Sequence, residues 1–223
     1  MRFFDQSSLL LWEPSRFFAT CRPTDPNWRA GAIAPFTCAA IYLGFELVMA
    51  KHLEPVVLAA VRDSGVPPFL LTSTLYSTAV ASALAFPLLW LASTAFLVSL
   101  DVLFVDRGDA RKQLELAGRA FVSQIPALVL LFIAASAFDG RTLHGLDLSR
   151  AENLGQLRAR FASSPMFATA TAVSQLSQVW LCALLALSYR SLSGLRAATT
   201  ALVAALLYGI FFLGGMLIPL LLD

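Results

Sequence analysis

Three aspartates stand close together after the second long apolar run of the chain: Asp101, Asp106 and Asp109. Carboxylate oxygens are the ligands that hard divalent cations prefer, so this group could in principle hold the metal of a membrane enzyme. However, the basic residues Arg107, Arg111 and Lys112 are interleaved with the acids. We therefore expect a charge-balanced cytoplasmic surface here, and we predict no enzyme.

Four polar residues fall inside long apolar runs and are the intramembrane candidates for function: Glu46, Gln124, Gln175 and Gln178. An ionisable group within a bilayer is costly, so it is a functional candidate by default. Glu46 could be a proton or cation site, or an interfacial carboxylate that reaches water or a loop cation. The three amides could line a path for a substrate or lipid headgroup. Alternatively, they could form interhelical hydrogen bonds of about 1 kcal/mol each.

Metal-binding and cofactor-binding patterns are absent from the sequence. The histidines His52 and His144 are far apart, and the cysteines Cys21, Cys38 and Cys182 have no regular spacing. A zinc site needs several such ligands at characteristic separations. We therefore predict no catalytic residue, no metal site and no cofactor.

The elements that carry these residues are five apolar runs: residues 31–50, 75–100, 120–138, 165–189 and 197–222. A helix needs roughly 20 apolar residues to span the hydrocarbon core. Charged residues make up only 13% of the chain, against roughly 25% in soluble domains. The sequence predicts an all-α fold, a polytopic membrane bundle of five transmembrane helices with short interfacial amphipathic helices.

The charge distribution predicts the topology. Short loops rich in Lys and Arg stay cytoplasmic, and ten of the sixteen Lys and Arg fall on the side of the amino terminus. We expect residues 1–30 to form a cytoplasmic interfacial segment and residues 31–223 to form the transmembrane domain. The amino terminus is then cytoplasmic and the carboxyl terminus outside. The net charge of only +2 indicates no nucleic-acid partner.

Short amphipathic segments flank the spans. In the first 30 residues, Phe17 and Phe18 could lie in the lipid as an interfacial anchor, or could pack under the bundle. Residues 54–61 predict a short helix between the first two spans. Residues 149–162 begin with a capping-box pattern and predict an amphipathic helix on the outer surface.

Rows of small residues and Pro87 are expected to shape the spans. One row is Ser77, Ala81 and Ala85, and the other is Ala197, Ala201, Ala205 and Gly209. Such rows let helices approach closely in lipid; we expect packing within the chain, with dimerisation as the alternative. Pro87 should bend the second span because proline removes a backbone donor. Pro126 lies one turn inside the third.

Several short motifs, taken in order, are similar to one family. Gly108, then Lys112-Gln113, then Pro126 resemble the cytoplasmic loop and third span of the Ypt/Rab-interacting (Yip) membrane proteins, in their bacterial branch. The element Pro14-Ser-Arg-Phe-Phe18 resembles the one before that family's first span. Trp180 and the segment 191–197 resemble the fourth loop, where Arg196 replaces the usual lysine.

The resemblance implies a five-helix bundle in a bacterial inner membrane, with a cytoplasmic amino terminus. Eukaryotic members bind Rab-type GTPases, but their amino-terminal motifs are not evident here, so we do not carry that role over. The first functional hypothesis is a non-enzymatic scaffold that organises lipids, further copies of itself or other membrane proteins. The alternative is a transporter or channel for ions, small molecules or lipids with a polar path near the midplane.

Overall fold

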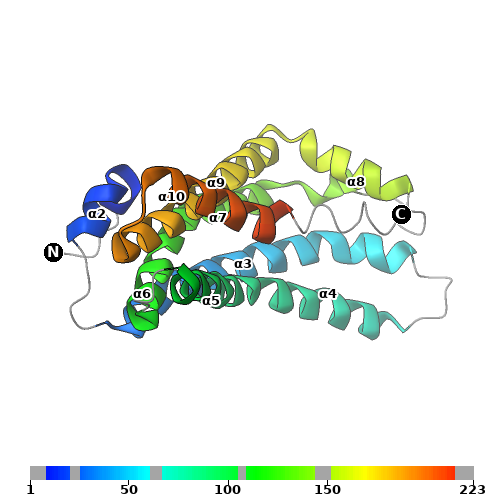
Figure 1. The fold of residues 1–223 in the computed structure, drawn as a ribbon. Coiled ribbons are helices and arrows are strands. Elements are labelled where there is room, and N and C mark those ends of the chain that lie inside the picture. The colour runs from blue at the N-terminus through cyan, green and yellow to red at the C-terminus, as the bar shows by residue number, and fades with distance from the viewer. Residues whose placement is uncertain (1–8, 21–25, 61–66, 105–108, 144–151, 214–223) are drawn as a thin grey trace. The chain divides into compact units, whose positions relative to one another are not determined.

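The computed structural model describes residues 9–20, 26–60, 67–104, 109–143 and 152–213. Within these ranges the chain contains helices and no strands (Figure 1). The α-helices are α2 (Pro14–Thr20), α3 (Trp28–Ala60), α4 (Pro68–Ala83), α5 (Ala85–Phe104), α6 (Ala110–Ala120), α7 (Ile125–Ala137), α8 (Glu152–Ala162), α9 (Pro165–Ser193) and α10 (Ala197–Tyr208). Shorter helical turns are η1 (Phe121–Gln124), η2 (Gly140–Leu143) and the π-helical η3 (Gly209–Leu213). The all-α prediction is confirmed.

Four helical segments are long and apolar enough to cross a bilayer: Trp28–Ala60, Pro68–Leu103, Ala110–Ala137 and Pro165–Ser193. The chain is therefore a multi-pass helical membrane protein. The fifth predicted span begins as α10 and continues through η3, a shorter apolar helix. Its remainder, residues 214–223, lies outside the described residues, so the count of five stays a prediction.

Prolines accompany interruptions of two of these segments, and the sequence predicts the first of them, the bend at Pro87. The break between α4 and α5 falls at Leu84, three residues before Pro87. The 3₁₀ turn η1 separates α6 from α7 just before Pro126. In both places the proline cannot donate to the preceding turn, and its ring crowds that turn's carbonyl.

The first span differs from the prediction at its carboxyl end. The sequence predicts a separate helix over residues 54–61, but α3 continues without a break to Ala60, through Pro55. The packing of Val56, which is buried against Leu143, holds this last part of the helix in place. One missing backbone hydrogen bond at Pro55 does not end a helix that is anchored in this way.

The described chain forms two compact units. Unit 1 comprises residues 1–38, 86–125 and 175–223, and unit 2 comprises residues 39–85 and 126–174. In unit 1, α3 and α6 cross with their backbones in contact at Gly31 and Gly118. A Cβ added to Gly31 would lie 2.7 Å from Glu115 Cα, and one added to Gly118 would overlap the Gly31 carbonyl group. Only glycine fits at such a crossing.

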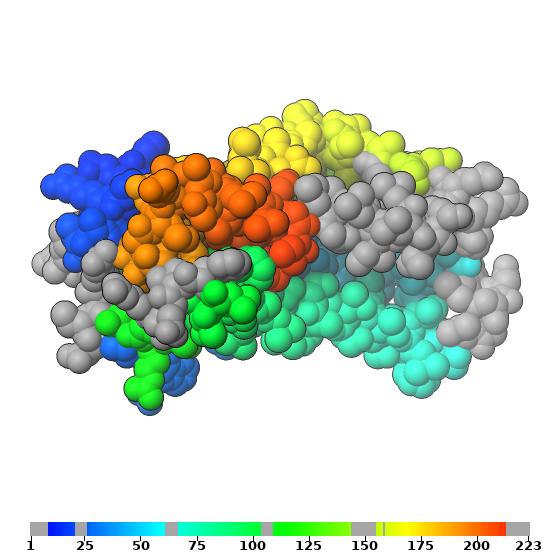
Figure 2. All heavy atoms as spheres, in the orientation of Figure 1, coloured from blue at the N-terminus to red at the C-terminus, as the bar shows by residue number. Residues whose placement is uncertain are grey.

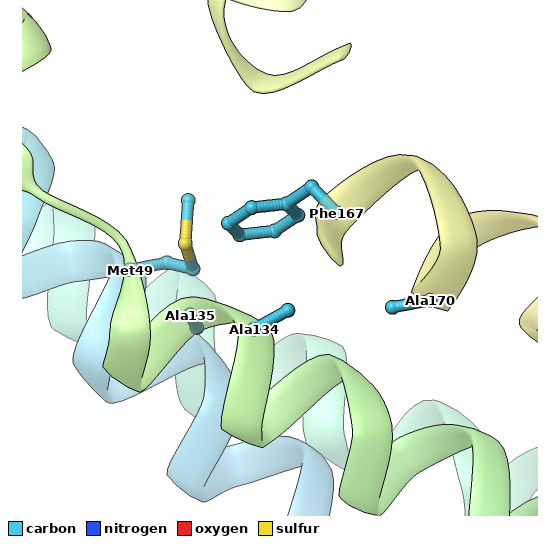
Figure 3. Close-up of a cluster of buried hydrophobic side chains, with 5 residues drawn as sticks. All are labelled: Met49, Ala134, Ala135, Phe167 and Ala170. Atoms are coloured by element: carbon cyan, nitrogen blue, oxygen red, sulfur yellow. The ribbon is translucent and has the colours of Figure 1, made fainter. Parts of the chain in front are cut away.

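Small and aromatic side chains form the core of unit 2. Met49, Ala134, Ala135, Phe167 and Ala170 pack together between α3, α7 and α9 (Figure 3). The Phe138 ring lies beside this cluster, with its centroid 5.5 Å from that of Phe167 in an edge-to-face arrangement. The alanines let the helices come close, and the phenylalanines fill the space that remains.

The amino-terminal segment packs within unit 1. Phe17 and Phe18 are each only 1% exposed, and their rings meet edge to face at 5.2 Å. Of the two interpretations above, a lipid anchor through these two rings is wrong, because both point into protein. Trp12, just before α2, is a large apolar side chain that is 85% exposed.

The helix expected over residues 149–162 is present as α8, and residues 149–151 lie outside the described ones. Its residues Leu157 and Phe161 pack against Val56 and Leu143. The apolar face of α8 therefore contacts protein in unit 2.

Both small-residue rows point away from the packed faces of their helices. Ser77, Ala81 and Ala85 are exposed, as are Ala197, Ala201 and Ala205, and Gly209 is half-buried. The faces that pack are others: Ala79 and Ala83 on α4, and Thr200, Val203 and Leu207 on α10. Parts of the α4 and α10 surfaces are visible in Figure 2. Intramolecular packing through these rows is thus not what the described residues show.

Candidate functional site

Polar side chains from three helices of unit 1 line one small cavity. Asp101 comes from the last turn of α5, Asp109 and Gln113 from the start of α6, and Tyr189 from the end of α9. Leu97, Val98 and Leu192 complete the lining of this space of about 10 Å³, which is close to the smallest that admits a water molecule. We call it the Asp101 cavity.

The orientation of the Gln113 amide follows from its neighbour Ser188. The Ser188 hydroxyl donates to the Leu185 carbonyl oxygen at 2.7 Å, so its one proton is committed and it can only accept from Gln113. Gln113 Nε2 donates to Ser188 Oγ at 3.0 Å. The amide oxygen must then face away from Ser188, and Gln113 Oε1 is buried without a hydrogen-bond donor among the described residues.

Asp101 is more deeply placed than the sequence indicates. The sequence predicts a charge-balanced cytoplasmic surface around this residue, but Asp101 is only 8% exposed. Its Oδ1 has no hydrogen-bond partner in the described part of the chain, and its carboxylate interacts electrostatically with Tyr189. A buried carboxylate without a partner is energetically costly.

Asp109 is the amino-terminal cap of α6. Its Oδ1 accepts from the Lys112 backbone N–H at 3.2 Å, and its Oδ2 pairs with Lys112 Nζ at 3.1 Å. Partial burial opposes ionisation, but the hydrogen bonds and the charge of Lys112 outweigh it and lower the pKa of Asp109 below its usual value. The Lys112 ammonium group is therefore paired with Asp109.

The predicted acidic cluster is only partly assembled. Asp101 and Asp109 share the cavity, whereas Asp106 lies outside the described residues. Across the described ranges, no three His, Cys, Asp or Glu side chains gather as metal ligands would. Divalent cations need more carboxylate and carbonyl oxygens than this pair supplies.

A second polar centre of unit 1 was missed by the sequence reasoning. The Glu115 side chain is 5% exposed and accepts from the Asn27 backbone N–H at 2.8 Å and from Arg119 Nη2 at 2.6 Å. These contacts tie the start of α3 to α6 beside the Gly31–Gly118 crossing. The Glu115–Arg119 spacing of four residues was a signal of a helical ion pair.

The intramembrane amides have different surroundings. Gln124 is buried and exchanges two hydrogen bonds with Ser177 of α9: Nε2 donates to the Ser177 carbonyl oxygen at 2.6 Å, and Ser177 Oγ donates to Oε1 at 3.0 Å. Gln175 is exposed and Gln178 half-buried. Two interpretations of the amides were offered above, a transport path and interhelical hydrogen bonds. For Gln124 the structure contains the interhelical hydrogen bonds.

Two glutamates of α3 in unit 2 are bonded to tyrosine and threonine. Glu46 is half-buried and hydrogen-bonded to Tyr42, one turn earlier on α3. Glu54 accepts from Thr72 and Tyr76 of α4, each at 3.3 Å. Glu54 was not among the residues singled out from the sequence, since it lies beyond the first apolar run.

A larger and more open cavity of unit 2, of about 270 Å³, lies at the amino-terminal end of α9. Its lining includes Phe138, Asp139, Thr142 and Arg160. The Arg160 guanidinium donates to the Thr142 carbonyl oxygen, so this cation already has an acceptor inside the chain.

Comparisons with known proteins returned no match for this chain among family models, curated proteins or solved structures.

Proposed function

We propose that this multi-pass membrane protein is a non-enzymatic scaffold of the Yip type, which holds lipids and other membrane helices. One observation carries the proposal: the two rows of small residues, Ser77-Ala81-Ala85 along α4 to the start of α5 and Ala197-Ala201-Ala205 on α10, are exposed. Rows with this spacing let a second helix approach closely in lipid. Exposed rows offer that contact to a partner.

The polar residues support the same proposal by what they already bind. Gln124 is satisfied by Ser177, and Glu115 by Asn27 and Arg119. A polar transport path needs side chains that face water and substrate. Groups that are committed to helix–helix hydrogen bonds favour a structural role, and this supports the scaffold at Gln124, one of the four residues that could line a transport path.

The composition of the particle in its native membrane tests the proposal. The full chain would be extracted directly into polymer nanodiscs and its mass measured. We expect a second copy or a second membrane protein with it. The variants Ala81→Leu and Ala201→Leu should reduce that association at least several-fold, because a leucine holds the helices apart.

Exposed apolar positions on the same helices provide matched controls. Val80→Leu and Leu202→Phe enlarge side chains that are 49% and 60% exposed but lie off the rows, and they should leave the association unchanged. A monomeric wild-type particle without any co-purified protein would contradict the proposal. So would equal association in the row variants and the controls.

A further inference from the structure

Two glutamine side chains of α9 have no hydrogen-bond partner in the described part of the chain. Gln175 is exposed and Gln178 is half-buried, and neither amide donates to or accepts from another described residue. Ser177, two residues after Gln175 and so on the opposite side of the helix, is the residue that bonds to Gln124. Each amide has two donor hydrogens and an acceptor oxygen, which are left over at the surface of α9.

Both amides lie deep within a segment that is long enough to cross the bilayer. The helix α9 runs from Pro165 to Ser193 and is one of the four candidate spans. Gln178 lies 13 residues after Pro165 and 15 residues before Ser193, about 20 Å from either end of the helix. Gln175 is one turn away from Gln178. Since the hydrocarbon core is about 30 Å thick, neither amide reaches the headgroup region.

Apolar side chains surround Gln175 on its face of α9. Leu176 is 70% exposed, and Val179, one turn after Gln175, is 51% exposed. A surface of this composition suits contact with lipid or with another helix rather than the wall of a water-filled path. In lipid, however, an amide without a hydrogen-bond partner is costly. The exposed amide therefore indicates a protein partner that brings polar groups to this face.

The chemistry of the amide favours a second copy of the chain as this partner. A primary amide is complementary to itself, because the N–H group of each donates to the oxygen of the other. Copies that are inserted in the same orientation are related by a two-fold axis perpendicular to the bilayer, which brings identical residues together at the same depth. A polar residue within an apolar helix contact also fixes the register of the two helices.

We propose that two copies of this chain pair through the exposed face of α9, where the Gln175 amides of the two copies exchange a pair of hydrogen bonds. Leu176 and Val179 pack beside these amides, and Gln178 lies at the edge of the contact. The contact goes beyond the proposed scaffold function, because it does not involve the rows on α4 and α10. Those rows remain available to other membrane helices.

The test is energy transfer between copies of the full chain in lipid vesicles. Copies that carry a donor or an acceptor fluorophore at the carboxyl terminus are mixed and diluted with increasing amounts of lipid. The wild-type protein should give a saturable dimerisation curve. Gln175→Leu should weaken dimerisation about tenfold, because two interhelical hydrogen bonds are lost. Gln175→Asn keeps the amide and should retain more of the dimer than Gln175→Leu.

The same substitution at another exposed glutamine is the matched control. Gln156 lies on α8 and is exposed, and Gln156→Leu should leave dimerisation unchanged. Because Gln175 makes no contact that the fold needs, Gln175→Leu should also keep the thermal midpoint of the monomer in dilute vesicles. Ala81→Leu and Ala201→Leu should dimerise like the wild-type protein.

Four results would overturn the proposal. One is wild-type energy transfer no greater than random proximity gives. A second is equal dimerisation of Gln175→Leu and Gln156→Leu. A third is transfer that is lost in Ala81→Leu or Ala201→Leu and kept in Gln175→Leu, which would assign the dimer to the rows and support the scaffold function alone. The fourth is faster reaction of Gln175→Cys than of the wild-type protein with a membrane-impermeant thiol reagent, which would assign this face to a water-filled path.

Discussion

Three carboxylates of unit 1 differ in what they contact. Glu115 has two donors, Asp109 caps a helix and pairs with Lys112, and Asp101 Oδ1 has no such partner in the described part of the chain. Removing one member of a buried hydrogen-bonded pair costs more than an exposed ion pair contributes, because it leaves an unpaired polar group. We therefore expect different changes in stability when each of the three acids is replaced.

Glu115→Ala should be strongly destabilising. It leaves the Arg119 guanidinium and the Asn27 N–H without their acceptor, at a cost of roughly 2–4 kcal/mol. Reversible unfolding in detergent micelles measures the change. Glu13→Ala removes a pair with Arg16 whose side chains are 56% and 69% exposed, and this control should change stability by less than about 0.5 kcal/mol. Equal effects of the two variants would show that Glu115 does not connect α3 with α6.

Asp109 should make stability depend weakly on pH in the acid range. Its pKa in the folded protein lies below the unfolded value of about 3.9. The stabilisation is therefore complete above that value and is lost as the pH falls through the folded pKa. The stability difference between wild type and Asp109→Asn should be constant near neutral pH and shrink below about pH 4. Because the Asp109 side chain is 40% exposed, a few tenths of a kcal/mol is the expected size. A difference that grows in acid would contradict the assignment.

Proline and glycine shape the helices of this chain in different ways. Proline bends or interrupts a helix, whereas glycine lets two helices cross closely. The bend at Pro87 was predicted from the sequence, because a missing donor is a local property of the backbone. The close crossing of Gly31 and Gly118 was not, because it pairs residues that are distant in sequence. Packing between elements decides that a glycine is required.

Gly118→Ala tests this crossing. The added methyl group would overlap the Gly31 carbonyl group, so α3 and α6 must separate, at about 3 kcal/mol or more. Gly155→Ala on α8 is the matched control, since no atom lies within 4 Å of its added Cβ; it should be neutral or stabilise by up to about 1 kcal/mol. Thermal unfolding of both variants in nanodiscs gives the comparison. Similar midpoints for the two variants would be inconsistent with the crossing.

The sequence was sufficient to predict which segments form helices, but not which side of each helix packs against protein. Long apolar runs predicted the spans because bilayer thickness fixes helix length, and α8 followed from its capping pattern and apolar spacing. The small-residue rows were expected to pack inside the chain, yet Ala81 and Ala201 are exposed. An apolar helix surrounded by lipid has no polar face, so composition does not show which side meets protein. Glu115 and Asp101 were hidden for a different reason: Glu115 contacts Asn27, and Asp101 lies beside Gln113 and Tyr189, and these residues are on other parts of the chain.

At the scale of the whole molecule, the loop charges predict the orientation in the membrane. We expect the amino terminus in the cytoplasm and the carboxyl terminus outside, which an odd number of spans requires. A phosphatase reporter that is active only outside should be active when fused after residue 223 and inactive when inserted after residue 108. The reverse pattern would invert the topology, and activity at neither site would exclude five spans.

The exposed rows on α4 and α10 are, in our proposal, the contact surfaces for a partner helix. The most direct measurement is cysteine cross-linking in native membranes, with single cysteines placed along residues 74–85 and 197–208. We predict cross-linked products that recur every four residues along a row, at positions 77, 81 and 85 or at positions 197, 201 and 205. The yield of cross-linked product should be lower at the off-row positions Val80 and Leu202. Uniformly absent products, or products without the four-residue period, would contradict this assignment.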